Sequence, residues 1–474
     1  MFCVLALCTN CGGGGGAVAT SYTVTYNGNG NTGGSVPTDL STYQQGGTVT
    51  ILGNTGSLVD SGSTFSGWTT ASDGSGTVYT AGQTLTVGTA NITLYAKWTA
   101  ANVLGYAYVV NYNGGSLGSI AQYTIGSDGS LTPMSIRTVS AAGNDTQYIS
   151  ADPSGKYIYV SNITSNTVGQ FMIGSDGTLT AMSTPTVAMG DLSGGKLYYP
   201  MGSLVHPNGK WFYVTNNQNG TVNAFTLGMT GSLTSMTTTT LTDPFDASNP
   251  KQAISPYAIA IDSTGKYAYV ISQVGNSTAN AIISQFNINQ TTGALEYNNS
   301  TMMGSTFITP WDIKIASIAS GQYVYVTNHQ NSTLWEYSIN SDGTLTSIGT
   351  LSVSSASGAA AHTISIHPSG KYAYVTMLAG TPNTVIAQLN INQSNGTLSL
   401  MSTPAVSAGG TAAEVMAIDP AGMYAYSTSA DSGWGSSSIS QFTIDQTTGA
   451  LTLMNTPTVQ TNGTGPGGIV VVWK

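Results

Sequence analysis

Few side chains in this 474-residue sequence are suited to acid–base chemistry. The chain has four histidines, nineteen acidic and ten basic residues, and only 6% of its residues are charged. His362, Glu414 and Asp312 stand out because each lies at the start of a short apolar run of strand type. A histidine beside a carboxylate can activate water against a carbonyl carbon. Whether these residues meet depends on the elements that carry them.

One phrase recurs along most of the chain. It reads "HPSGKYAYVT" from His367, "DPSGKYIYVS" from Asp152, "HPNGKWFYVT" from His206, "DSTGKYAYVI" from Asp262 and "DPAGMYAYST" from Asp419. A catalytic loop is needed once, whereas a phrase repeated roughly every 50 residues indicates a repeated structural unit. We interpret His206 and His367 as turn residues, because they take the place of the Asp in the other copies.

The repeated unit predicts four short strands joined by a "PSGK" turn, a loop and a Gly-containing hairpin. The hairpins begin at Ser127, Ser175, Met229, Thr291, Ser341, Ser394 and Thr447. The turns are one fewer, at Asp152, His206, Asp262, Ala316, His367 and Asp419. The first unit lacks a first strand, and the chain ends in one, Ile469–Val472. We therefore predict an all-β, seven-bladed β-propeller over residues 101–474, closed by the carboxy-terminal strand.

The motifs "PSGKYAYVTN", "TVxQFxI" and "TGALTxM" resemble the lactonase family of seven-bladed propellers. That family includes a 6-phosphogluconolactonase and a muconate-lactonising enzyme. "YVSN" at Tyr159 and "YVTN" at Tyr213 and Tyr325 also resemble YVTN-type surface-antigen propellers. The resemblance implies a site over the central channel, on the face where first strands begin. It leaves the activity open, because one fold hosts many functions.

Alignment of the first strands gives the candidate site. We expect His362 to be a general base, with Glu414 or Asp312 orienting it. The expected ligand-binding residues are Gln147, Tyr257, Trp311, His329, Lys196 and Lys251. Each has a structural alternative: His362 as a hydrogen-bonded strand end, the carboxylates as solvated groups, and Trp311 and Tyr257 as a plug of the channel.

The basic residues disfavour a phosphorylated substrate, because a phosphate needs several cations or amide donors around it. The resemblance implies an arginine near the site, but Arg137 is the sole arginine and falls in a predicted connection between blades. Lys156, Lys210, Lys266 and Lys371 lie in the "PSGK" turns, on the opposite face.

Residues 21–100 have a different pattern. The stretch "FSGWTTASDGSGTVYTAGQTLTV" followed by "ITLYAKW" closely resembles the internalin-type B-repeat. The resemblance implies a small β-grasp-like module of bacterial surface proteins. Phe65, Trp68 and Trp98 are expected to form its core, with an aromatic binding patch as the alternative.

The first 20 residues resemble the end of a bacterial lipoprotein signal, in which a cysteine follows an apolar run. Cys11 directly precedes five glycines, so it is the predicted lipidation site, with Cys8 as the second candidate, and the glycines are the predicted tether. A Gly-rich tail without processing is the alternative. The expected location is exported, as an outer-membrane or cell-surface lipoprotein or an extracellular protein.

The remaining composition excludes several classes of partner. A net charge of −9 argues against nucleic acid, and no apolar run reaches the roughly 20 residues of a membrane-spanning helix. No residue spacing predicts a metal site, and no cofactor is expected.

Two hypotheses of function follow. The first is a surface-anchored binding or structural protein whose channel face takes a glycan, a peptide or another surface partner. The second is an exported lactonase that acts on a sugar or aliphatic lactone through His362 and a carboxylate. The sequence favours the first, because of the modular order and the missing arginines.

Overall fold

The computed structural model describes residues 20–60, 63–100, 102–190, 198–245, 254–275, 280–304, 308–353, 360–378, 385–408, 412–430 and 437–474. The chain divides into two compact units, Met1–Ala101 and Asn102–Lys474. In the described residues the regular elements are strands, apart from one 3-10 turn at Asn113–Gly115. The predicted all-β class is therefore confirmed.

The first unit is a small mixed sheet with two short ribbons. Its main sheet has the order β2-β8-β5-β6, in which β2 and β8 are parallel, and β1-β3 and β4-β7 form the ribbons. Trp68 is fully buried between Tyr26 and Phe65, as expected of a core residue. The strands are β1 (Ser21–Tyr22), β2 (Val24–Asn27), β3 (Tyr43–Gln44), β4 (Thr48–Thr50), β5 (Ser63–Thr69), β6 (Val78–Tyr79), β7 (Thr84–Thr86) and β8 (Ile92–Ala100).

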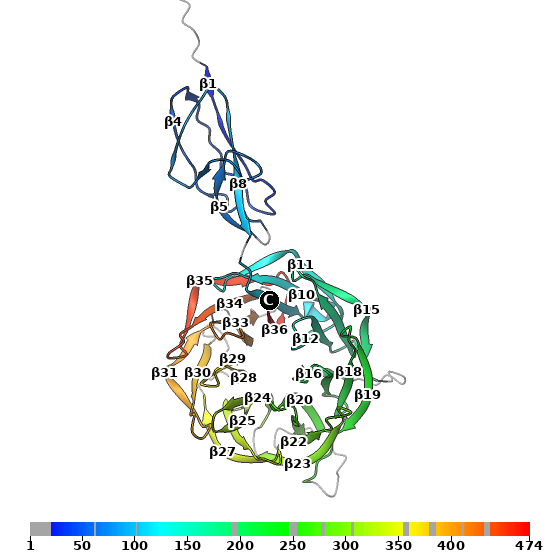
Figure 1. Ribbon diagram of the computed structural model, residues 1–474. Helices are drawn as coiled ribbons and strands as arrows, with labels where there is room; N and C mark the ends of the chain where they lie inside the picture. Colours follow the sequence, from blue (N-terminus) through cyan, green and yellow to red (C-terminus); the bar gives the residue numbers. More distant parts are fainter. Residues whose placement is uncertain are drawn as a thin grey trace, which may run out of the picture. The chain divides into compact units, whose positions relative to one another are not determined.

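The second unit is a ring of seven four-stranded antiparallel blades (Figure 1). From the inside outward, blade 1 contains β36 (Pro466–Trp473), β9 (Gly105–Asn111), β10 (Leu117–Ile125) and β11 (Leu131–Asn144). Blade 2 contains β12 (Thr146–Ala151), β13 (Tyr157–Asn162), β14 (Thr167–Ile173) and β15 (Leu179–Ala188), and blade 3 contains β16 (Pro200–Val205), β17 (Trp211–Asn216), β18 (Thr221–Leu227) and β19 (Leu233–Thr240). Blade 4 contains β20 (Ile254–Ile261), β21 (Tyr267–Val274), β22 (Asn280–Ile288) and β23 (Leu295–Gly304).

Blades 5 to 7 repeat the same order. Blade 5 contains β24 (Pro310–Ile318), β25 (Gly321–Asn328), β26 (Thr333–Ile339) and β27 (Leu345–Ser352). Blade 6 contains β28 (Ala360–Ile366), β29 (Tyr372–Leu378), β30 (Val385–Ile391) and β31 (Leu398–Ser407). Blade 7 contains β32 (Ala413–Ile418), β33 (Tyr424–Ala430), β34 (Ser437–Ile444) and β35 (Leu451–Gln460).

The ring closes where the sequence predicts. β36 pairs antiparallel with β9, with Ile469 opposite Val109 and Val472 opposite Tyr106, so the end of the chain supplies the innermost strand of the first blade. This pairing removes the free edge that β9 would otherwise present. Arg137 lies in β11, the outer strand of that blade, rather than in a connection between blades, because β11 is 14 residues long.

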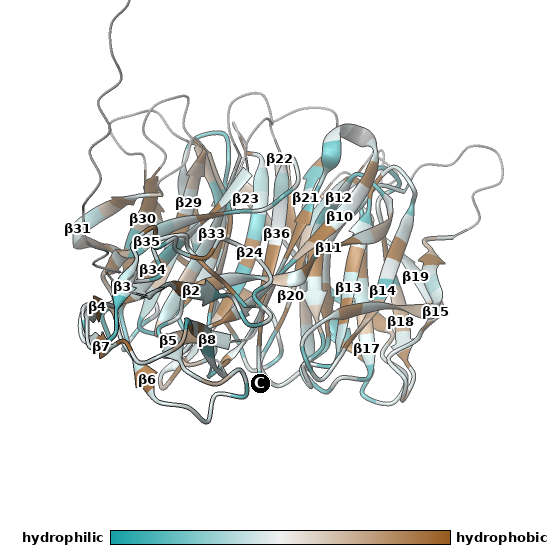
Figure 2. Ribbon diagram, turned by 90° about the horizontal axis from the view of Figure 1, so that it is seen from above, coloured by the Kyte–Doolittle hydropathy of each residue, from teal (hydrophilic) through white to brown (hydrophobic). Residues whose placement is uncertain are grey.

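Apolar residues recur along the strands of the blades, as the hydropathy colouring shows (Figure 2). The second tyrosine of each "YAYV" phrase is fully buried and donates its hydroxyl to a hairpin carbonyl in the next blade; Tyr108 and Gly177 are one such pair, at 2.6 Å. The same contact closes the ring, because Tyr426 of blade 7 donates to Gly129 of blade 1 at 2.6 Å. The repeated phrase thus fixes each blade to its neighbour.

Candidate functional site

The threonine of the repeated "YVT" phrase positions the start of the next blade's inner strand. Thr327 donates to the backbone carbonyl of His362 at 2.7 Å, and Thr376 donates to that of Glu414 at 2.9 Å. Thr428 makes the same bond to Gly467 at 2.9 Å. In these three blades the same structural residue therefore holds the backbone of a channel-mouth residue in the neighbouring blade.

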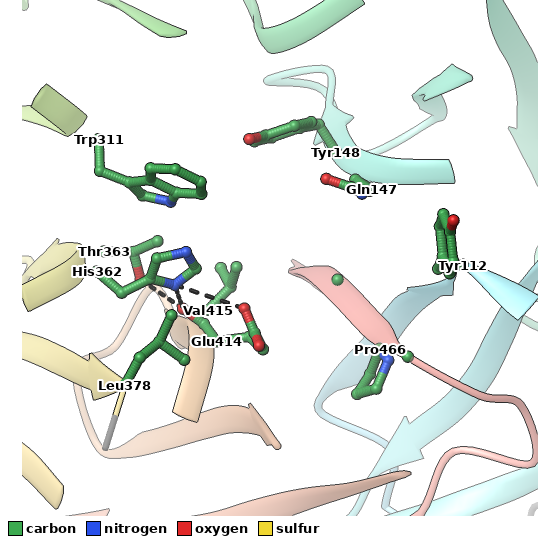
Figure 3. Close-up of a pocket in the computed structure, with 12 residues that line it drawn as sticks. Tyr112, Gln147, Tyr148, Trp311, His362, Thr363, Leu378, Glu414, Val415 and Pro466 are labelled. Atoms are coloured by element: carbon green, nitrogen blue, oxygen red, sulfur yellow. Dashed lines mark hydrogen bonds and ion pairs between the residues drawn. The ribbon is translucent and has the colours of Figure 1, made fainter. Parts of the chain in front are cut away.

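These strand starts surround a cavity of about 340 Å³ at one end of the central channel, here called the mouth cavity (Figure 3). A cavity of this size suits a small organic ligand. Its lining residues are Tyr112, Gln147, Tyr148, Trp311, His362, Thr363, Leu378, Glu414, Val415, Gly465, Pro466 and Gly467.

His362 and Glu414 lie together in this cavity. The Nδ1 atom of His362 is 2.8 Å from the backbone carbonyl oxygen of Glu414 and 3.6 Å from its Oε2. A carbonyl oxygen can only accept, so Nδ1 carries the hydrogen and Nε2 keeps its lone pair. In Figure 3 the other ring nitrogen of His362 points away from Glu414, toward the space below Trp311.

Burial favours the uncharged form of both groups. Desolvation lowers the pKa of His362 to about 4, against an opposing contribution from its hydrogen bond to Glu414. Desolvation also raises the pKa of Glu414 to about 7. The hydroxyl of Tyr148 likewise stays protonated, because burial raises its pKa. The cavity therefore presents a neutral imidazole beside a carboxyl group that is protonated below about pH 7.

Aromatic rings support His362 from one side. Trp311 lies 4.8 Å from His362, 5.1 Å from His329 and 5.6 Å from Tyr257, measured between ring centroids. Burial lowers the pKa of His329. Neither Tyr257 nor His329 lines the mouth cavity, but both contact Trp311, which does.

Asp312 faces another direction. Its Oδ1 atom is 2.6 Å from Nζ of Lys314, and its Oδ2 atom accepts a hydrogen bond from the backbone N–H of Ile364 at 3.1 Å. The carboxylate therefore joins two blades and neutralises Lys314 in the channel, and it is not part of the mouth-cavity lining. Successive strand residues point to opposite sides, which separates Asp312 from Trp311.

The structure thus brings His362, Glu414, Trp311 and Gln147 to one cavity and places Asp312, Tyr257 and His329 around it. Lys196, Lys251 and Cys11 lie outside the described residues, so their predicted roles stay predictions. The predicted list omits Tyr112 and Leu378, which follow or end second strands. The rule that these strands end on the mouth face was the signal that could have found them.

The described parts of the chain contain no group of three or more His, Cys, Asp or Glu residues arranged to hold a metal ion. They also contain no helix of the length and apolarity that crossing a bilayer requires.

The seven four-stranded blades and the cavity at the channel mouth identify the second unit as a seven-bladed β-propeller. The sequence matches the Lactonase, 7-bladed beta-propeller family over residues 72–194, 203–317 and 314–471. The chain therefore belongs to this family. Residues 22–97 match the Listeria-Bacteroides repeat domain, which confirms the repeat module expected from the sequence.

Solved structures agree on the fold. A proposed 6-phosphogluconolactonase from Bacteroides fragilis superimposes with a TM-score of 0.61 at 19% identity, over 78% of this chain and 98% of that one. One from Bacteroides uniformis gives 0.61 at 19%, over 78% and 100% of the two chains. The periplasmic gluconolactonase PpgL of Pseudomonas aeruginosa gives 0.60 at 15%, over 77% and 99%. Identities this low establish the shared fold alone.

A short stretch of the chain also matches a curated protein. A protein of Evansella cellulosilytica, named as a Gly-rich membrane protein, is 49% identical over 59 residues. The match spans 12% of this chain and 6% of that protein. It therefore carries no argument about what either whole protein does.

Proposed function

We propose that the propeller hydrolyses a small, uncharged lactone in the mouth cavity. The observation that carries this proposal is His362, whose Nδ1 is committed to the carbonyl of Glu414 so that Nε2 is the basic nitrogen. The fold family and its gluconolactonase relative support the same reaction class. The sequence alone favours a binding or structural protein, because it does not give the distance between His362 and Glu414; with that distance we favour the hydrolase.

The reaction needs one base and one acid. Nε2 of His362 takes a proton from water as the water oxygen attacks the lactone carbonyl carbon. The protonated carboxyl of Glu414 donates a hydrogen bond to the oxyanion that forms on the carbonyl oxygen. The ring C–O bond then breaks, and the ring oxygen takes the proton from the His362 imidazolium. The product is the open-chain hydroxy acid.

The lining of the mouth cavity favours an uncharged substrate. None of its residues is a lysine or arginine, within the part of the chain that the structure describes. Glu414 is the one acidic residue among them, and it is protonated below about pH 7. A phosphorylated lactone would therefore lose its hydration without gaining a charged partner. The faces of Trp311 and Tyr148 offer stacking surfaces for a ring instead.

A substrate panel tests the proposal. We expect the full chain to hydrolyse uncharged lactones and to leave 6-phosphogluconolactone at the buffer rate. His362→Gln should lose activity by a factor of about 100 or more, the usual effect of removing a general base. His367→Asp is the matched control, because Asp already fills this turn position in three other blades, at Asp152, Asp262 and Asp419. Equal activity in wild type and His362→Gln would refute the proposal.

The repeat module supports a second candidate function. Residues 22–97 match a repeat domain whose presence is independent of any hydrolase site. A surface-held propeller would then bind a glycan or peptide through the aromatic rings at the mouth without turning it over. Lipidation at Cys11 belongs to this candidate, whereas export is expected for both. Labelled lipid incorporation into the full chain, lost in Cys11→Ser, tests the anchor; no incorporation in the wild type would contradict it.

A further inference from the structure

A second cavity continues from the mouth into the central channel. This channel cavity has a volume of about 440 Å³ and shares Tyr148, Thr363 and Val415 with the mouth cavity. Its wall is mostly aliphatic, because the innermost strands of several blades turn isoleucine or leucine toward it. Six of these residues are Ile149, Leu204, Ile259, Ile261, Ile315 and Ile469.

Two of the polar side chains on this wall, Lys314 and Ser203, already have partners. Nζ of Lys314 contacts Oδ1 of Asp312 at 2.6 Å, and that carboxylate is held by backbone N–H groups of Ile313 and Ile364. The hydroxyl of Ser203 lies 3.0 Å from that of Ser150. A polar arm entering the channel would compete with these pairs, whereas an apolar arm would leave them intact.

We propose that the channel cavity receives an aliphatic arm of the substrate, so that the lactones this protein takes are alkyl-substituted. The ring would lie in the mouth cavity beside His362 and Glu414, and the arm would run past Val415 into the channel. This inference rests on the proposed lactone hydrolysis and names its substrate class. Burial of methylene groups against the isoleucine wall supplies the selectivity.

A chain-length series tests this inference. We expect kcat/KM for γ-lactones to rise roughly threefold to fourfold for each added methylene, from an unsubstituted ring to an octyl side chain, as burial of one methylene predicts. Ile315→Asn should reduce the ratio of the octyl to the unsubstituted substrate by about tenfold or more, and Ile315→Val should keep it. Because this ratio compares two substrates on the same protein sample, the variant needs only to be folded, which a melting curve verifies. A flat series would overturn the inference while hydrolysis of the unsubstituted lactone still stood.

Binding of compounds that cannot be hydrolysed separates the two claims. We expect 2-alkyl tetrahydrofurans to bind more tightly as the alkyl chain lengthens, measured by calorimetry. Such binding without hydrolysis of any lactone would refute the proposed function and retain the apolar channel site. A preference for lactones with a terminal carboxylate on the arm, lost in Lys314→Met, would show that Lys314 recognises an anion and would overturn the apolar assignment.

Discussion

His362 and Glu414 are uncharged for the same reason, which is loss of solvent at the channel mouth. The side chain of His362 is 6% exposed and that of Glu414 is 19% exposed. Desolvation penalises the charged form of each, so it moves the pKa of the base down and the pKa of the acid up. Both groups are neutral in the window between about pH 4 and about pH 7.

This burial predicts an effect of Glu414 on stability. The folded state binds this proton more tightly than the unfolded state, so stability falls as pH rises from 4.5 to about 7. Glu414→Gln should therefore raise the free energy of unfolding by about 2–3 kcal/mol at pH 8 and by less than about 1 kcal/mol at pH 5. Urea denaturation at both pH values measures it. An equal increase in the free energy of unfolding at pH 5 and pH 8 would contradict a buried Glu414 carboxyl that titrates between these values.

Alignment of the seven repeats with one another predicts which residues lie at the channel mouth, because the first strands of all blades in a propeller start on the same face. Of the strand-start residues that this rule selects, Gln147, Trp311, His362 and Glu414 line the mouth cavity, whereas Tyr257 does not; their roles in binding or catalysis stay predictions. The rule did not give the partner of Asp312, because it compares strand starts with one another and not residues along one strand. Lys314 follows two residues later, on the same side of the strand, and the pair forms within a single strand.

At the scale of the strands, a buried glutamine links neighbouring blades. In blade 6, Gln388 donates to the carbonyl of Thr403 in its own blade at 2.9 Å and accepts from the N–H of Leu451 in blade 7 at 2.7 Å. Blades 1, 2 and 7 have the same pair of bonds. Blade 5 has Glu336 instead, which accepts from Leu398 at 3.0 Å and whose pKa is raised by burial.

Glu336→Gln should therefore stabilise the propeller. A glutamine would keep the acceptor, gain a donor and remove the cost of a buried carboxylate, for a gain of about 1 kcal/mol. The reverse change, Gln388→Glu in the next blade, is the matched control and should destabilise by a similar amount. Chemical denaturation at pH 8 measures both. Destabilisation by Glu336→Gln would show that the acid has a structural role of its own.

The hairpin glycines form a second link between blades. Gly177 has φ of 86°, and a Cβ there would meet the ring of Tyr106 in the preceding blade. Gly209 has a similar φ of 71° with open space around its Cβ position. Gly209→Ala should cost about 1–2 kcal/mol for backbone strain, and Gly177→Ala about 1–3 kcal/mol more for the clash. Equal losses would contradict the packing of Tyr106 on this hairpin.

For the whole molecule, the number of blades and the closure were predictable because the repeat could be counted. Seven hairpins against six turns left one first strand unaccounted for, and the chain ended in that strand. The volume of the mouth cavity was not predictable, because the mouth-face rule can indicate that Tyr112 and Leu378 line it but not how closely they approach. Their positions depend on packing between blades.

Ring closure predicts the effect of truncation. Removal of residues 466–474 deletes β36, exposes the inner edge of β9 and takes Ile469 and Val472 from the core. We expect the truncated chain to lose cooperative thermal unfolding and to aggregate, because the first blade then has an open edge. A synthetic peptide of residues 463–474 should partly restore the transition. An unchanged melting curve after truncation would contradict closure by this strand.

The pH dependence of kcat/KM for an uncharged lactone tests the central claim most directly, because it reports the acid and the base of the free protein. The claim predicts a bell that rises through about pH 4, as His362 loses its proton, and falls through about pH 7, as Glu414 loses its own. In Glu414→Gln the upper limb should disappear and the lower limb should remain. A rate that climbs steadily above pH 7 in both proteins would contradict catalysis by this pair.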